Sequence, residues 1–194
     1  MCSPRFRKPA GNLIAISARS QGQFPHTILL RCAPHRGKEN TISTQTVPTQ
    51  TARDFRAELS KLRAALLALP PTLADVPWRA GGWTRKQIVG HLLDSAANNR
   101  QRFVRATIDG QYAGPGYAQD AWVAAHGYAE AEWETLLRWW QAEHEILMAA
   151  VDRIPQERLV ASCVVGDDAP VTLRFLIEDY VSHQKGHFKQ LQAA

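Results

Sequence analysis

Hydrophobic and polar residues alternate with a helical period in four long segments of this chain. The first covers residues 53–69 and is stopped by the pair Pro70 and Pro71, which cannot continue a helix. The other three cover residues 84–108, 131–153 and 172–192. Each segment has one apolar stripe, so each is expected to become stable by packing that stripe against the others.

The second segment also carries the local sequence of a helix start and a helix end. Thr84 followed three residues later by Gln87 has the form of a capping box, in which the two side chains satisfy backbone N–H groups of the first turn. Asp109 and Gly110 supply a typical C-terminal end. This segment therefore predicts a well-defined helix.

The connections between the segments differ in length and character. Residues 111–127 predict a turn-rich loop with a short helix near 119–125, and residues 159–170 predict local extension. No strand-like run is long enough to predict a sheet. The expected fold is all-α, a four-helix bundle whose connections are long enough for a crossover.

The first fifty residues lack any sustained period and mix proline with Ser, Thr, Gln and Arg. Three interpretations remain open: a disordered tail, a targeting segment, or sequence upstream of the true start. We therefore divide the chain into an extension, residues 1–50, and a bundle domain, residues 51–194.

The charged residues are unevenly distributed between the extension and the bundle domain. The chain has a net charge of +5, and residues 1–50 hold seven Lys and Arg against one Glu. The remaining 144 residues hold 16 basic and 17 acidic side chains. A near-neutral bundle without a basic stripe argues against nucleic-acid binding.

Cysteine content and hydropathy indicate the compartment. Cys2, Cys32 and Cys163 form no even-numbered disulfide framework, which favours a reducing environment. Cys32 and His35 have no second pair at zinc-finger spacing. No apolar run approaches the roughly 20 residues that span a bilayer. We expect a soluble cytoplasmic protein without a membrane partner.

Two candidate functional residues, His183 and His187, lie four residues apart on the apolar stripe of the last segment. Residues at this spacing share a helix face, and buried imidazoles need partners. His91, on the corresponding side of the second segment, is the natural third member. Three imidazoles predict a metal site with an open position. The alternative is a chance pair of histidines.

Residues close to the three histidines in sequence indicate which chemistry such a site could have. Gln184 occupies the place where zincin proteases have a glutamate base, so peptide hydrolysis by that route is disfavoured. Asp94, Glu178 and Asp179 could orient imidazoles but are expected to be ordinary helix-surface acids. We interpret the remaining histidines outside the extension as surface or core residues. These are His126 and His144.

Residues 78–95, with Trp83, Thr84 and His91, followed much later by the paired histidines of residues 179–187, resemble the DinB-like/YfiT-like metalloenzyme superfamily. The likeness covers residues 54–191. It implies a DinB-like four-helix bundle in which one histidine of the second helix and two of the fourth bind a metal.

Carried to this sequence, the resemblance implies that His91, His183 and His187 bind a divalent metal, zinc or nickel. It implies a thiol transferase that uses a low-molecular-weight thiol on a small-molecule substrate. The alternatives are a metal-dependent hydrolase, a non-catalytic metal- or ligand-binding module, and a homodimer-forming protein. No catalytic side chain beyond the ligands is assigned.

The sequence does not assign any residue to the lining of a substrate pocket. Asn98, Asn99 and Arg102 follow His91 along the second segment, and Arg102 could hold a carboxylate. Side chains of these types on a helix are usually solvated. Three tryptophans could line an apolar wall of such a pocket, but aromatic residues at helical spacing are expected to be core residues. The three tryptophans are Trp122, Trp139 and Trp140.

Overall fold

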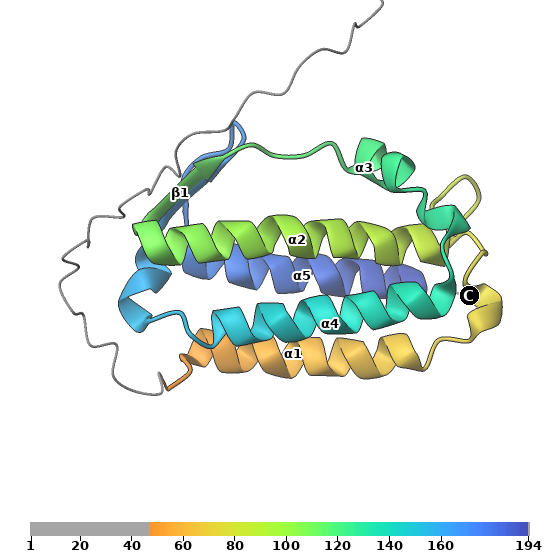
Figure 1. Ribbon diagram of the computed structural model, residues 1–194, viewed down its shortest axis with the longest axis horizontal. Helices are drawn as coiled ribbons and strands as arrows, with labels where there is room; N and C mark the ends of the chain where they lie inside the picture. Colours follow the sequence, from red (N-terminus) through yellow and green to blue (C-terminus); the bar gives the residue numbers. More distant parts are fainter. Residues whose placement is uncertain (1–46, 194) are drawn as a thin grey trace, which may run out of the picture. The chain divides into compact units, whose positions relative to one another are not determined.

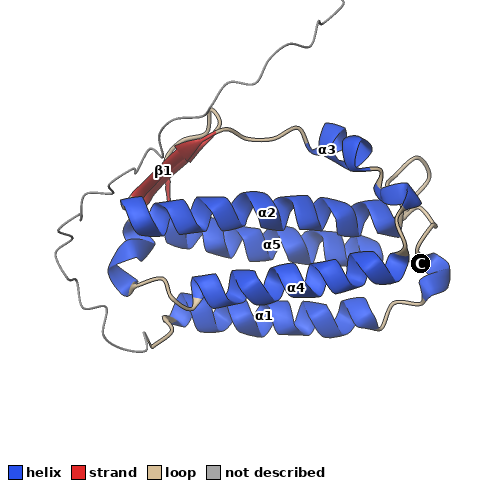
Figure 2. Ribbon diagram, viewed as in Figure 1, coloured by secondary structure: helices blue, strands red, loops and turns tan. Residues whose placement is uncertain are grey.

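A computed structural model describes residues 47–193, and these residues form the predicted all-α four-helix bundle (Figure 2). The bundle helices are α1 (Gln50–Leu67), α2 (Arg85–Asp109), α4 (Trp133–Val151) and α5 (Leu173–Leu191). Each matches a segment expected from the sequence within a few residues. Cys2, Cys32, His35 and most of the predicted extension lie outside the described residues.

The four helices follow an unusual order of directions. In Figure 1, α1 and α5 run one way, whereas α2 and α4 run the other way. Contacts are made between α1 and both α4 and α5, and between α2 and both α4 and α5. The consecutive helices α1 and α2 therefore lie diagonally across the bundle. The neighbours α2 and α4 are parallel.

Parallel neighbours require a connection as long as the helices, and residues 110–132 provide it. This crossover contains β1 (Gln111–Gly114), α3 (Gln119–His126) and a 3-10 turn, η2 (Tyr128–Glu130). It starts at one end of α2 and returns along that helix to the other end (Figure 1). Both the predicted crossover and the predicted short helix are confirmed.

The crossover packs closely on α2. A Cβ added to Gly90 would lie 2.1 Å from ring atoms of Tyr128, far inside van der Waals contact. Tyr128 is itself buried. A glycine at this point of α2 therefore allows the crossover to approach the helix backbone.

One expectation was wrong, because the described residues do contain a small sheet. β1 pairs in parallel with β2 (Ser162–Val165), which pairs antiparallel with β3 (Val171–Thr172). The strands have only four, four and two residues. Strands this short do not show a recognisable alternation of apolar and polar residues in the sequence. In addition, the pairing of β1 with β2 joins segments that are distant in sequence.

Helix ends agree with the local sequence. Thr84 accepts a hydrogen bond from the Gln87 backbone N–H while the Gln87 side chain accepts one from the Thr84 N–H, so the predicted capping box is present. Gly110 ends α2 in the left-handed region, with φ of 75°. Thr49 caps α1 and Thr172 caps α5. The remaining short turns are η1 (Pro71–Leu73) and η3 (Gln156–Val160).

The core contains a buried polar chain as well as apolar side chains. His144 donates from Nδ1 to the Trp140 carbonyl at 2.7 Å, and its Nε2 accepts from the Tyr180 hydroxyl at 2.7 Å. Gln184 in turn donates to the Tyr180 oxygen at 3.0 Å. Of the two interpretations given for His144, a surface or a core residue, the structure shows the core one.

Hydropathy of the described helices gives one further result. Within residues 47–193, none of the helices combines the length and the apolar character needed to cross a membrane.

Candidate metal centre

The structure brings together the three histidines singled out from the sequence. His91 comes from α2, and His183 and His187 come from successive turns of α5. One ring nitrogen of each lies within 4.8 Å of the others. Nε2 of His91 is 3.0 Å from Nε2 of His183, and His187 has its ring centroid 4.6 Å from each of the other two.

Burial keeps these imidazoles neutral. His91 is fully buried, and desolvation, followed by the charges of His187 and His183, lowers its pKa to about 3. Desolvation and then the charge of His187 lower the pKa of His183 to about 4. Desolvation also lowers the pKa of His187. At neutral pH all three rings therefore offer a lone pair, the form that binds a metal.

Each α5 histidine has a neighbouring polar side chain at its Nδ1, and for His187 this partner fixes which ring nitrogen is free. Nδ1 of His187 donates to Oε1 of Gln190 at 2.8 Å, which leaves its Nε2 as the lone-pair atom. Nδ1 of His183 lies 3.4 Å from Oγ of Ser95. Such second partners orient ligand rings in metal sites. Nδ1 of His91 is buried with no hydrogen-bond partner among the described residues.

Trp83 forms an apolar wall beside the histidines. Its ring centroid is 5.0 Å from that of His91 and 6.4 Å from that of His187, to which it is nearly parallel. Trp83 directly precedes the capping residue Thr84, so the start of α2 positions both the wall and His91. The wall lowers the local polarity and strengthens electrostatic interactions at the cluster.

Within residues 47–193, no cysteine or carboxylate joins the three-histidine group. The donor set is therefore three neutral imidazoles, which suits zinc, nickel and related divalent ions. Gln184, next to His183 in sequence, is fully buried against Tyr180. The residue at the zincin base position thus belongs to the core rather than to the cluster.

The three acids considered as orienting groups behave differently from one another. Asp94 is buried, accepts a hydrogen bond from the Tyr128 hydroxyl at 2.7 Å and pairs with the exposed His126, with Nδ1 at 3.2 Å. The expectation of a surface acid was wrong for Asp94, because the crossover covers it. Glu178 and Asp179 are exposed, and neither forms a hydrogen bond with a site histidine among the described residues.

A polar cleft of about 320 Å³ lies next to His183. Helices α2 and α5 form two of its walls, and the crossover and the β2–β3 turn complete it. Its polar lining residues are Ser95, Asn99, Arg102, Tyr117, Gln119, Asp168, Asp179, Tyr180 and His183. A concave volume into which polar groups converge is one feature of small-molecule sites, although such sites usually have a more apolar lining.

Sequence reasoning named some of the lining residues and missed others. Asn99 and Arg102 line the cleft and are buried, whereas Asn98 donates to the Asp94 carbonyl at 2.9 Å and does not line it. Gln190 sits three residues after His187, a helical spacing that could have identified it. Tyr117 comes from the crossover, and nothing in the local sequence indicated its place.

The three tryptophans considered from the sequence differ in their burial. Trp140 is buried and stacks on His144 at 3.8 Å between centroids, as expected for a core residue. Trp122 and Trp139 are 37% and 46% exposed, so the core expectation was wrong for them. Trp122 belongs to the crossover, and the Trp139 ring centroid lies 6.4 Å from that of Tyr128 in the crossover. The local helical period does not show which residues such a distant segment covers.

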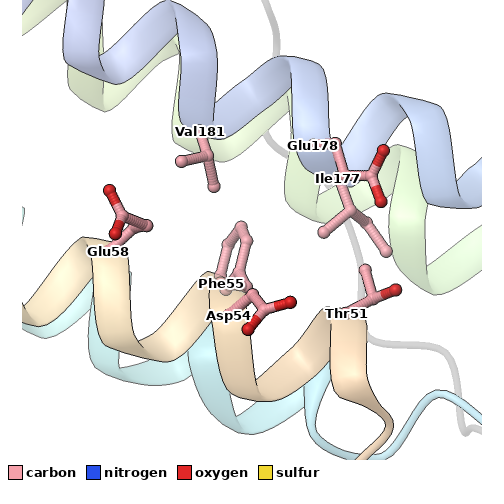
Figure 3. A pocket seen from close by; sticks show the side chains of 7 residues that line it. All are labelled: Thr51, Asp54, Phe55, Glu58, Ile177, Glu178 and Val181. Carbon is pink, nitrogen blue, oxygen red and sulfur yellow. The ribbon is translucent and has the colours of Figure 1, made fainter.

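A second hollow, of about 210 Å³, lies between α1 and α5 (Figure 3). It is lined by Phe55 and Ile177 together with the acids Asp54, Glu58 and Glu178. Glu58 is paired with lysines at 2.6 and 3.0 Å. This hollow contains none of the three histidines. Glu178 thus faces a separate part of the surface.

The fold and the site place the chain in a known class. The sequence model of the DinB superfamily matches residues 50–191, and the chain belongs to that superfamily.

Two curated relatives match over shorter segments. The Bacillus subtilis protein named "Putative metal-dependent hydrolase YfiT" is 36% identical over 63 residues, which are 32% of this chain and 35% of that protein. A Bacillus cereus (strain B4264) protein with the same description is 34% identical over 73 residues, 38% of this chain and 40% of that protein. The matches thus span less than half the length of these relatives.

Solved structures extend the likeness to the whole bundle. The structure of Bacillus subtilis YfiT, described as an unusual four-helix bundle topology, has a TM-score of 0.66 at 22% identity and covers 77% of this chain and 89% of that one. A mycothiol-dependent maleylpyruvate isomerase has a TM-score of 0.62 at 14% identity, covering 74% and 60%. At these identities the likeness concerns the fold.

Proposed function

We propose that His91, His183 and His187 bind a divalent metal ion, zinc or nickel, and that the protein is a metal-dependent thiol transferase. The observation that carries the proposal is the convergence of three neutral ring nitrogens within 4.8 Å, one from the buried His91 and two from the partly buried His183 and His187. Three protein ligands leave a coordination position for a small molecule, as in catalytic metal sites.

A divalent metal at this position would lower the pKa of a coordinated thiol, so that the nucleophilic thiolate forms at neutral pH. The chain's own residues prepare the site for this chemistry. Ser95 and Gln190 orient the rings of His183 and His187, and Trp83 shields the cluster from water on one side. The adjoining cleft provides space for a thiol and an electrophilic small molecule.

A metal-dependent hydrolase is the second candidate, supported by the names of the curated relatives. The same three histidines would then present an activated water. We rank the thiol transferase first because no carboxylate joins the three histidines within residues 47–193, and the two acids of the adjoining cleft, Asp168 and Asp179, are exposed. A thiolate nucleophile needs no such base once it is formed.

Metal content tests the first part of the proposal. Protein purified without an affinity tag should contain about one zinc or nickel ion per chain by elemental analysis. His183→Ala/His187→Ala should abolish it, whereas His126→Ala, which changes an exposed histidine outside the cluster, should leave it unchanged. A wild-type protein that takes up no divalent metal would exclude both enzymatic candidates.

Substrate consumption tests the second part. The metal-loaded protein is supplied with glutathione, bacillithiol or mycothiol and a panel of electrophiles, and thiol loss is compared with hydrolysis of aryl esters. Thiol consumption that disappears in the double histidine variant supports the transferase. Ester turnover without thiol consumption would favour the hydrolase, and neither reaction would favour a non-catalytic metal-binding module.

A further inference from the structure

Arg102 is a buried arginine in the cleft beside the histidine cluster. It lies on α2 and is only 8% exposed. It lines the same cleft as Ser95 and His183. Ser95 marks the level of the cluster, because its hydroxyl lies 3.4 Å from Nδ1 of His183.

The guanidinium of Arg102 has almost no partners. Its one hydrogen bond to a described residue is from Nη1 to Oδ1 of Asn99, at 3.3 Å. Within residues 47–193, no carboxylate oxygen lies within 4.0 Å of it. No Arg102 nitrogen is among the fully buried atoms that lack a partner among the described residues, so its unbonded N–H groups are open to the cleft, while most of the side chain is removed from water. Charges in such positions are normally paired.

Arg85 shows how this fold satisfies a buried arginine that has a structural role. It is 2% exposed and donates to the backbone carbonyls of Val76, Pro77, Leu191 and Ala193. Those bonds join the start of α2 to the end of α5. Arg102 makes no comparable set of bonds. A ligand bound in the cleft would supply the hydrogen-bond acceptors that Arg85 finds in backbone carbonyls and that Arg102 lacks.

The rest of the cleft indicates which ligand would fit. Tyr117, from the crossover, lies near Ser95 and Arg102, and burial raises its pKa to about 12, so its hydroxyl stays neutral. Asp168 and Asp179 also line the cleft but are exposed. One buried cation with two exposed acids suits a zwitterion better than a polyanion, because the acids repel excess negative charge.

We infer that Arg102 is an anion subsite that binds a carboxylate of a zwitterionic, peptide-sized molecule whose other end reaches the three histidines. The inference deepens the proposed function and rests on it for the identity of the reacting end. Arg102 follows Ser95 by seven residues, about 10 Å along the helix axis. That distance is about the extended length of three residues.

Binding of S-methylglutathione tests the subsite separately from the metal chemistry. This probe keeps the carboxylates and the amine of glutathione but has no free thiol, and its diethyl ester removes the carboxylate charges. Calorimetric titration of the metal-loaded wild type should show at least tenfold tighter binding of S-methylglutathione than of the ester. A hydrogen bond between a guanidinium and a carboxylate typically changes the binding affinity by roughly ten- to hundredfold.

Arg102→Met should remove that preference, and Arg102→Lys should keep part of it because the charge remains without the guanidinium fork. Arg105→Met, on the exposed face of the same helix, is the matched control and should bind like the wild type. Far-ultraviolet circular dichroism and the thermal midpoint check that each variant is folded. Should Arg102→Met not fold, the wild-type preference and Arg102→Lys still decide the question.

The outcomes separate this inference from the proposed function. A wild type that binds S-methylglutathione no more tightly than its ester, or an Arg102→Met variant that keeps the preference, overturns the anion subsite. Loss of the preference in Arg102→Met, together with equal binding of glutathione and S-methylglutathione, keeps the subsite and contradicts a free thiol at the metal.

Discussion

The hydroxyl of Ser95 lies 3.4 Å from Nδ1 of His183, so α2 both supplies one histidine of the cluster and supports another from α5. Ser95 is one turn beyond His91 and is buried. Its oxygen also lies 3.4 Å from Nδ2 of Asn99. The serine therefore links the cluster to the cleft.

Replacing this serine should weaken metal binding without removing a ligand. Ser95→Ala leaves Nδ1 of His183 without its partner, and the ring becomes less well oriented. We expect the affinity for zinc to fall by roughly tenfold, the lower end of effects at such positions. Competition with a chromophoric chelator measures the change.

Ser182→Ala is the control for the serine prediction. Ser182 is exposed on α5, and its hydroxyl donates to the Glu178 carbonyl at 3.1 Å. It should bind zinc like the wild type. Equal affinities for Ser95→Ala and the wild type would show that Ser95 does not orient His183.

Protonation of the buried histidines should couple stability to pH in the metal-free protein. Burial is the main cause of the lowered pKa values of His91, about 3, and His183, about 4. An unfolded histidine titrates near 6.5, so below that pH the unfolded chain binds protons that the folded chain does not. The free energy of unfolding should be highest above about pH 7 and should fall as the pH drops from 6.5 towards 4.

Urea denaturation at successive pH values measures this dependence. Each such histidine contributes at most about 1.4 kcal/mol per pH unit to the slope. His183→Gln/His187→Gln should flatten the slope, because two groups whose pKa is lowered in the folded state are then absent. A slope that the double variant leaves unchanged would assign the pH dependence to other groups, such as the buried His144, whose pKa burial lowers to about 4.

The polar chain through Tyr180 should contribute to stability. Tyr180→Phe removes the hydroxyl that donates to His144 and accepts from Gln184, both of which are buried. Two buried polar groups then lose a partner, at a cost of about 2–3 kcal/mol in the free energy of unfolding. Urea titration at neutral pH provides the value.

Tyr112→Phe is the comparison for the tyrosine prediction. Tyr112 is in β1, and its hydroxyl forms no hydrogen bond with a described residue. Its removal should change the free energy of unfolding by less than about 0.5 kcal/mol. If the two variants were equally stable, the Tyr180 chain would contribute nothing.

The close approach of the crossover to α2 predicts opposite effects at two helix glycines. In Gly90→Ala the new methyl group collides with the Tyr128 ring, so the crossover must shift, at a cost of about 1–3 kcal/mol. Gly186→Ala, on α5, meets nothing within 4 Å and should stabilise the protein by about 0.5–1 kcal/mol. Thermal denaturation compares them, and a stabilised Gly90→Ala would contradict the packing described.

Much of the bundle could be predicted from sequence because its determinants are local. The apolar stripes, the Thr84 and Gln87 capping box and the glycine at position 110 fixed the limits of α2. His91, His183 and His187 could be grouped because helical spacing shows which residues share a face. Their closeness across two helices then followed from packing the apolar faces together.

The remaining features depend on contacts between distant segments. The sheet pairs Tyr112 with Cys163, and no local pattern specifies that partner. The covering of Asp94 by Tyr128 and the place of Tyr117 in the cleft depend equally on how the crossover lies against α2. Burial of Arg102 likewise became clear only in three dimensions.

The parallel direction of α2 and α4 obliges the chain to travel back along the bundle, and this return segment supplies Gly116, Tyr117 and Gln119 to the cleft. The three histidines, by contrast, lie on helices whose spacing the core dictates. Replacements or insertions in residues 115–118 can therefore reshape the cleft while the helices that carry the histidines stay in place. The fold thus places the three-histidine cluster on the packed helices and part of the neighbouring cleft on a connecting segment that the core does not constrain.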